Sequence, residues 1–264
     1  MLDLDAYFRR IDYTGITDPT IEILRGIHVA HRCAVPFENL DIHMGVPISL
    51  DIDHLAEKIV TNGRGGYCFE QNTLMLHVLR EIGFDVTPRE ARVGSTDDPS
   101  RTRSHMTLEV RTSDGAYNVD AGFGTSGHVE PLPLDGSVHA EGDRQFRVVE
   151  QADVTVVQSP AAEGWADLYA IESGEPTPVD FDVASWYTST HPKSSFRKMP
   201  VAQIQTLDER FDLRRRTYVH ERGGVELERE LSDEEIPALL IEAFGIDLGP
   251  GASRINFAGQ APSD

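Results

Sequence analysis

The hydrophobic pattern of the chain changes at about residue 84, and no other feature constrains the fold as strongly. Before this point apolar residues recur at helical spacing, and after it they alternate with polar residues over short runs. Helices followed by paired strands are typical of an α+β protein. At 264 residues the chain can form one large domain or two to three small ones.

The first third of the chain is predicted to be helical. Residues 18–33 fit a helix with Asp18 as N-cap, and residues 51–61 fit a second helix. A third helix is expected over 68–82, because apolar residues repeat at helical spacing there until Gly83 ends the run.

The middle third is predicted to be antiparallel. Residues 104–112 and 116–124 alternate on either side of the turn sequence "SDG". Further alternating runs follow at 145–150 and 153–158. This succession favours an antiparallel barrel or a sandwich.

The last part of the chain mixes both patterns. Residues 211–231 are expected to form a hairpin around two glycines, and Ser232 and Glu235 match a capping box for a helix over 233–244. The Gly-, Pro- and Ser-rich tail from residue 249 is expected to be loose.

Composition excludes several classes of protein. A formal charge of −20 argues against a general nucleic-acid surface, which needs clustered Lys and Arg. No stretch approaches the ~18 apolar residues of a membrane span, and acids stand where a signal peptide would be basic. We therefore expect a cytoplasmic protein that binds neither nucleic acid nor membrane.

The cysteines and histidines indicate neither a disulfide framework nor a metal site. Cys33 and Cys68 are the two cysteines, and both are expected to be reduced thiols in the cytoplasm. His28 and His31 lie near Cys33, but no second cluster would complete a metal site, so no metal is expected.

The segment "RGGYCFEQN" (64–72) raises the question of why a cysteine stands there. At the start of a helix, Cys68 would meet unpaired backbone N–H groups and the positive end of the dipole, which favour a thiolate. Gly65 and Gly66 would allow a sharp bend and leave room for a substrate. The alternative is a small buried core residue, because free cysteine is among the most buried types.

Several motifs together resemble the arylamine N-acetyltransferases. They occur in the family's order and spacing: "LDAYFRRIDYTG" near the N-terminus, "PFENL" (36–40), "RGGYCFEQN" with Cys68, "SHMTLEV" with His105 and "NVDAGFG" with Asp120. The resemblance implies a helical bundle over 1–83 that carries the cysteine, a β-barrel over 84–190 that carries His and Asp, and an α/β lid over 191–264. The Cys-His-Asp arrangement would be similar to that of cysteine proteases.

The resemblance also implies an activity. Cys68 would take an acetyl group from acetyl-CoA as a thioester and pass it to an arylamine, an arylhydrazine or an N-arylhydroxylamine by a ping-pong route. His105 would accept the thiol proton, and Asp120 would orient the ring and stabilise its cation.

Other positions match the family less specifically. The resemblance implies CoA contacts by Ser104, Gly122 and Gly124, and an acceptor pocket lined by Phe37, Tyr67, Val93 and Phe196. For Phe37 and Tyr67 a core role remains equally open. Arg64 is expected to form a structural ion pair with Glu38 or Glu70.

The simplest strand pairing does not bring the three residues together. If Asp114 and Gly115 are the two turn residues, Asp120 opposes Glu109, about 13 Å along the strand from His105 at ~3.3 Å per residue. The Cys-His-Asp arrangement therefore depends on the resemblance and not on this register.

Other functions remain open from sequence. The same chemistry would serve an amide synthase that closes a macrolactam from a carrier-bound acyl chain. A Cys-His-Asp hydrolase, a transglutaminase-like enzyme and a non-catalytic binding protein are further alternatives. Nothing in the sequence decides the oligomeric state, and a homodimer is compatible with it.

Overall fold

The computed structural model describes residues 2–94, 98, 100–151 and 153–258. Its helical segments are α1 (Leu4–Arg10), α2 (Ile21–Ala34), α3 (Leu40–Met44), α4 (Ile52–Leu55), the π-helical η1 (Ala56–Thr61), α5 (Cys68–Ile82), α6 (Pro178–Thr190), α7 (Ile236–Phe244) and the 3-10 helices η2 (Gly124–Ser126), η3 (Ser195–Arg197) and η4 (Gly249–Arg254). Within the described residues, no helix has the length and apolar character needed to cross a membrane.

Strands of the described part of the chain form two antiparallel sheets. The larger sheet has the order β5-β4-β3-β2-β9-β8-β7-β6 and curls until β5 contacts β7, so it is a nearly closed barrel. Its strands are β2 (Asp85–Val93), β3 (His105–Thr112), β4 (Gly115–Val119), β5 (Leu132–Pro133), β6 (Val138–Glu141), β7 (Arg144–Gln151), β8 (Val154–Pro160) and β9 (Trp165–Glu172). The barrel predicted for the middle third is confirmed.

The smaller sheet has the order β1-β10-β11-β12-β13. Its strands are β1 (Phe37–Glu38), β10 (Val201–Gln205), β11 (Glu209–Arg214), β12 (Thr217–Arg222) and β13 (Val225–Glu230). The pairing of β1 with β10 ties the N-terminal region to the C-terminal one.

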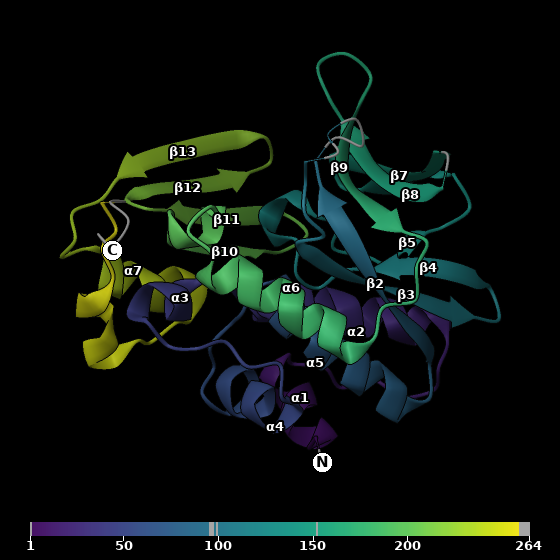
Figure 1. Ribbon diagram of the computed structural model, residues 1–264, viewed down its shortest axis with the longest axis horizontal. Helices are drawn as coiled ribbons and strands as arrows, with labels where there is room; N and C mark the ends of the chain where they lie inside the picture. The colour runs from purple at the N-terminus through teal and green to yellow at the C-terminus, as the bar shows by residue number, and fades with distance from the viewer. Residues whose placement is uncertain (1, 95–97, 99, 152, 259–264) are drawn as a thin grey trace.

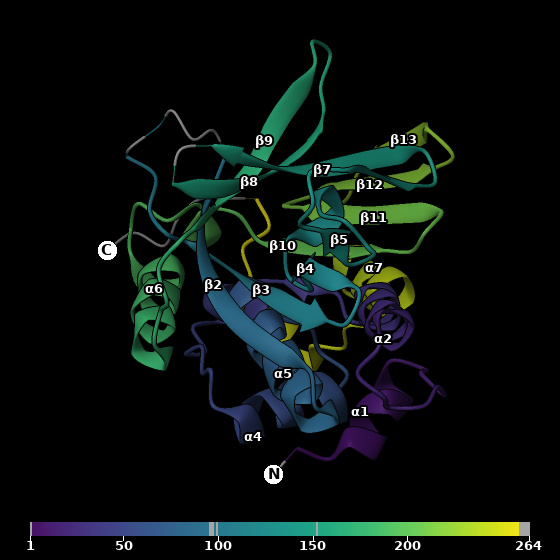
Figure 2. The same cartoon turned by 90° about the vertical axis from the view of Figure 1, so that its right-hand side faces the viewer.

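The helices near the N-terminus lie on one side of both sheets. Figure 1 shows α1, α4 and α5 below the sheets. Helix α6 lies in front, between the sheets and these helices. In the view turned by 90°, α6 and α2 lie on opposite sides of α5 (Figure 2). Leu74 and Val78 of α5 share one buried cluster with Leu108 and Val110 of β3, so the helix is packed against the barrel.

The predicted helices are present, but the first and the last of them begin later than predicted. The second predicted helix is α4 continued by η1, and α5 ends where Gly83 takes a left-handed backbone (φ 106°). The first predicted helix begins later than expected, at Ile21. Thr20 is its N-cap and accepts a hydrogen bond from the Ile23 N–H at 3.4 Å, so the prediction of Asp18 as N-cap is wrong.

The hairpin of β3 and β4 has a different register from the simplest one. Thr112 pairs with Gly115, so the turn consists of Ser113 and Asp114 and not of Asp114 and Gly115. Each residue of β4 therefore lies opposite a β3 residue two positions closer to His105 than the simplest pairing predicts. The strand ends at Val119, opposite Leu108.

The hairpin around the two glycines is present, but residues 211–231 include parts of three strands, because β11 also pairs with β12. The prediction for the tail is wrong. Strands β12 and β13 pair around the predicted glycines, and the last helix, α7, begins only at Ile236. After residue 249 the chain forms η4, and Ile255 and Phe257 are buried beside Phe244. These apolar side chains hold the segment against the core; residues 259–264 lie outside the described part.

Candidate active site

Cys68 is the first residue of α5 and lies on the wall of a cavity of about 620 Å³. The cavity is bounded by the start of α5, the beginning of β3, the turn after β4, the end of α6 and the segment around η3. A larger cavity of about 1330 Å³ lies on another part of α6. We place the site in the smaller cavity because Cys68 and His105 line it.

The bend that delivers Cys68 depends on two glycines and a carboxylate. A Cβ atom at Gly65 would lie 1.9 Å from the Pro36 carbonyl oxygen, and one at Gly66 would lie 2.8 Å from Cβ of Glu70. The Glu70 carboxylate accepts a hydrogen bond from the Tyr67 backbone N–H at 3.1 Å. Only a chain without side chains at these two positions can pass so close to its neighbours.

His105 and Asp120 form a buried pair next to this cysteine. Nε2 of His105 lies 2.6 Å from Oδ2 of Asp120, and both side chains are almost fully buried. The Cys68 thiol donates a weak hydrogen bond to the Ser104 carbonyl oxygen at 3.7 Å, one residue before His105. The structure therefore brings the three predicted residues together.

The electrostatics of the pair favour an imidazolium. Burial alone would lower the pKa of His105, but the charge and hydrogen bond of Asp120, helped by Cys68, raise it to about 10. Burial alone would raise the pKa of Asp120, but His105 holds it well below its usual range. The ring can therefore stay protonated beside an ionised carboxylate at neutral pH.

Asn72 holds Asp120 in place from the same helix that carries Cys68. Its Nδ2 donates to Oδ1 of Asp120 at 3.0 Å, and its Oδ1 accepts the Ala121 N–H at 2.9 Å. The Gly122 N–H also donates to Oδ1 of Asp120, at 3.0 Å. Asn72 lies one helical turn after Cys68, so its placement toward the site could have been read from the sequence.

The observed register explains why the expected separation of about 13 Å is wrong. Asp120 follows the end of β4 and lies near the level of Thr107, two residues from His105, instead of opposite Glu109. The chain turns directly after Asp120, and its side chain then reaches the His105 ring.

Three of the four predicted acceptor-pocket residues line the cavity: Phe37, Val93 and Phe196. The rings of Phe37 and Phe196 meet edge to face, with centroids 6.1 Å apart. Tyr67 is fully buried, and its hydroxyl lies 2.6 Å from the Ser185 hydroxyl, so its prediction as a lining residue is wrong. It packs behind Phe196, at 5.5 Å between centroids.

The residues predicted to contact CoA differ in their position relative to the cavity. Ser104 and Gly122 line the cavity. Gly124 lies beyond the cavity wall, and its carbonyl oxygen accepts hydrogen bonds from Arg32 at 2.5 Å and from Gln205 at 3.5 Å. Its left-handed backbone (φ 69°) shows that it is a turn residue, and its contact with CoA stays a prediction.

Sequence reasoning missed several residues around the His105 ring and the cavity. Phe123 and Tyr169 flank His105, with ring centroids 5.0 and 4.9 Å from it. Phe123 directly follows Gly122 in a recognised motif, whereas Tyr169 comes from β9 and carries no local signal. The cavity wall also includes three cations that had not been considered: Arg101, Lys193 and Arg214.

The remaining predicted positions have structural surroundings. Arg64 pairs with Glu38 at 2.7 Å and with Asp41 at 2.8 Å; Glu70 is not its partner. Among the residues that the structure describes, no three His, Cys, Asp or Glu side chains gather as a metal site would require.

The chain is similar to known proteins in sequence and in fold. A family model described as N-acetyltransferase matches residues 20–253. An arylamine N-acetyltransferase of Mycobacterium tuberculosis is 40% identical over 261 residues, which cover 96% of this chain and 92% of the relative. The structure of Mycobacterium marinum arylamine N-acetyltransferase in complex with CoA is similar at a TM-score of 0.90 and 35% identity, covering 96% of this chain and 97% of that one.

A third relative carries a second activity in its name. It is the arylamine N-acetyltransferase / N-hydroxyarylamine O-acetyltransferase of Salmonella typhimurium, 35% identical over 196 residues, or 74% of this chain and 70% of the relative. The fold and these matches define an acyltransferase. The chain belongs to the arylamine N-acetyltransferase family, which confirms the resemblance and the α+β fold expected from sequence.

Proposed function

We propose that the protein transfers acetyl groups from acetyl-CoA to arylamines, arylhydrazines or N-arylhydroxylamines through a thioester on Cys68. The observation that carries this proposal is the His105–Asp120 pair, joined at 2.6 Å beside a cysteine on the wall of a cavity. The membership of the family, with a relative solved in complex with CoA, supports the donor.

In the first half-reaction, the Cys68 thiolate attacks the acetyl carbonyl carbon of acetyl-CoA. A new bond forms to Sγ, and the bond to the CoA sulfur breaks. His105 gives its proton to the departing CoA thiolate and becomes neutral. Nε2 of His105 is held by Asp120, so Nδ1 is the nitrogen left to exchange this proton.

In the second half-reaction, the neutral nitrogen of the acceptor attacks the thioester carbon. His105 takes a proton from that nitrogen, the bond to Sγ breaks, and the thiolate–imidazolium pair is restored. Backbone N–H groups at the start of α5 are the candidate donors to the tetrahedral oxyanion.

The cavity has features that suit both substrates. We assign the acceptor ring to the side with Phe37, Val93 and Phe196, and the CoA thiol end to Ser104 and Gly122. The thiols of Cys33 and Cys68 are unpaired in the structure, and a reduced nucleophile with a supply of acetyl-CoA suits the cytoplasm.

The test is incubation with acetyl-CoA, first alone and then with aniline or an arylhydrazine. Alone, the enzyme is expected to release one CoA thiol per active site and to carry one acetyl group on the peptide with Cys68. With the amine, thiol release should become continuous, and Cys68→Ala should abolish both. If no acetylated amine forms above background, or if Cys68→Ala still turns over, the proposal is wrong.

The relatives above give no support to the macrolactam-forming alternative. They are named for the acetylation of arylamines or N-hydroxyarylamines. Offering a carrier-bound acyl chain in the same assay distinguishes the two donors directly.

A further inference from the structure

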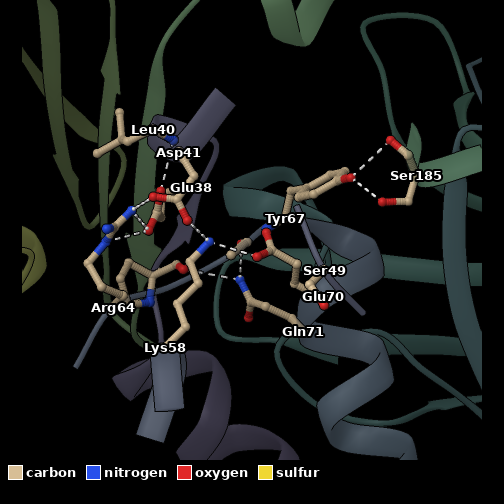
Figure 3. A network of polar contacts seen from close by, with 12 residues as sticks. Glu38, Leu40, Asp41, Ser49, Lys58, Arg64, Tyr67, Glu70, Gln71 and Ser185 are labelled. Carbon is tan, nitrogen blue, oxygen red and sulfur yellow. Dashed lines mark hydrogen bonds and ion pairs between the residues drawn. The ribbon is translucent and has the colours of Figure 1, made fainter. Parts of the chain in front are cut away.

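Five buried charged side chains form ion pairs directly beside the start of α5, and Figure 3 labels them. The cluster contains two cations and three carboxylates: Lys58, Arg64, Glu38, Asp41 and Glu70. Their side chains are at most 13% exposed. Because burial of charge is costly unless each charge is paired, the partners of each group matter.

The two cations divide the carboxylates between them. Arg64 binds Glu38 and Asp41, while Lys58 binds Asp41 at 2.6 Å and Glu70 at 2.7 Å. Within the described residues, Lys58 is the only cation in an ion pair with Glu70. The ion pair of Lys58 with Glu70 therefore connects the cluster to α5, which carries Glu70.

Glu70 connects Lys58 to the backbone just before Cys68. One carboxylate oxygen accepts from Lys58 Nζ, and the other accepts from the Tyr67 N–H at 3.1 Å. The side chain also packs so tightly on Gly66 that no Cβ atom fits there. Moving the Glu70 carboxylate would therefore move the residue before Cys68.

We propose that Lys58 and Glu70 act as a positioning pair for Cys68. Glu70 holds the bend before the helix, and Lys58 both anchors the carboxylate and offsets its charge near the sulfur. Neither residue lines the cavity, so their effect on the reaction passes through Cys68. The inference rests on the proposed function, in which Cys68 carries the acetyl group.

The charge balance around the pair supports this role. Burial raises the pKa of Glu70 to about 7 against the opposing effect of Lys58. Burial alone would lower the pKa of Lys58, but Glu70, Glu38 and Asp41 together raise it, so the ammonium stays charged. Without that ammonium, the pKa of Glu70 would rise further and the buried carboxyl would take up a proton, which would weaken its hold on the Tyr67 N–H.

The first experiment compares Lys58→Met with Lys58→Arg. The readouts are the rate of Cys68 acetylation per active thiol, the acetyl-CoA concentration at half-saturation and the melting temperature. Lys58→Met is expected to slow acetylation by about tenfold or more, because small displacements of a reacting group have such effects. The acetyl-CoA concentration at half-saturation should barely change. Lys58→Arg keeps the positive charge and should recover most of the acetylation rate.

The second experiment measures how the rate of Cys68 alkylation by iodoacetamide falls as the pH is lowered. Glu70→Gln keeps an oxygen that can accept from Tyr67 but removes a negative charge. The fall is therefore expected at lower pH than in the wild type, a shift that a purely structural role would not cause. If Glu70→Gln does not fold, the Lys58→Met/Glu70→Gln double variant, which buries no new net charge, carries the test: its acetylation rate should exceed that of Lys58→Met.

Arg89→Met is the matched control, because Arg89 forms a partly buried ion pair with Glu109 at 2.8 Å on the barrel, away from Cys68. It should lower the melting temperature without changing either Cys68 readout. The inference is overturned if the Lys58 and Glu70 variants keep the wild-type rate per thiol and the wild-type pH dependence, whatever their stability. A wild-type enzyme that never accepts an acetyl group would instead refute the proposed function.

Discussion

Gly122 lies so close to Cys68 that a Cβ atom added to it would stand 2.4 Å from the Cys68 Cα atom. The turn that follows Asp120 is therefore packed directly on the helix start that carries the sulfur. This contact links the two halves of the site, because the Gly122 N–H also binds the Asp120 carboxylate.

We expect Gly122→Ala to misalign the site. The new methyl group meets backbone, which cannot move aside as a flexible side chain can, and a displacement of about 1 Å costs roughly 100-fold in rate. Gly174→Ala is the control, since no heavy atom lies within 4 Å of its added Cβ. The measurement is the rate of Cys68 acetylation per folded molecule. Equal rates in the two variants would contradict the close contact.

Asp120→Asn is expected to leave the fold intact and to reduce activity by about 10⁴-fold, the scale seen when a triad histidine takes the wrong tautomer. The Asn oxygen can still accept from Asn72 and Gly122, but its NH₂ group would donate to His105 Nε2. The proton would then stay on Nδ1, the nitrogen needed by Cys68. Activity should recover partly at high pH, where the thiolate forms without a base. A pH–rate profile identical to that of the wild type would refute the assigned tautomer.

The His105–Asp120 pair also predicts how stability depends on pH. The pKa of His105 is raised from 6.5 to about 10 on folding, so the protonated ring stabilises the fold fully below about 6.5. This contribution is lost as the pH rises toward about 10. The pKa of Asp120 is lowered, so its contribution is lost in acid instead. Urea unfolding of the wild type should show a decline between about pH 6.5 and 10 that His105→Gln largely lacks.

Local sequence signals located some elements well and others poorly. The end of α5 was predictable because Gly83 takes a backbone conformation that other residues avoid. The start of α2 was not, since Asp18 and Thr20 are both good N-caps and only the folded chain selects one. In the β3–β4 hairpin, "SDG" marks a turn without saying which two residues form it, and a change in turn position shifts the whole register.

Local sequence signals were also insufficient to assemble the candidate site. Cys68, His105 and Asp120 were found by resemblance, because strand spacing alone separated the last two. The burial of Tyr67 and the pairing of Lys58 with Glu70 depend on segments that meet only in three dimensions. Local pattern carries no information about such contacts, although it does place each residue on its helix or strand.

Phe196→Ala is expected to affect the acceptor and spare the donor. Loss of the Phe196 ring removes an aromatic partner for the acceptor ring and should raise the amine concentration at half-saturation by about 2- to 10-fold, from ~0.5–1.5 kcal/mol per aromatic pair. Acetylation of Cys68 by acetyl-CoA should change little, because a ping-pong enzyme separates the two steps. Trp186→Ala, which removes an exposed ring from α6, is the control. If Phe196→Ala slows only the donor step, the acceptor assignment is wrong.

Iodoacetamide is expected to label Cys68 before Cys33, although Cys68 is the more buried of the two. Burial raises the pKa of the Cys33 thiol, which keeps it in its unreactive protonated form. Cys68 opens onto the cavity, so its sulfur is reachable, and in the proposed mechanism His105 beside it makes it the nucleophile. Peptide mapping should place the first label on Cys68, acetyl-CoA should protect it, and Cys33→Ser should still take up one label. A label confined to Cys33 would mean that exposure and not the histidine governs thiol reactivity here.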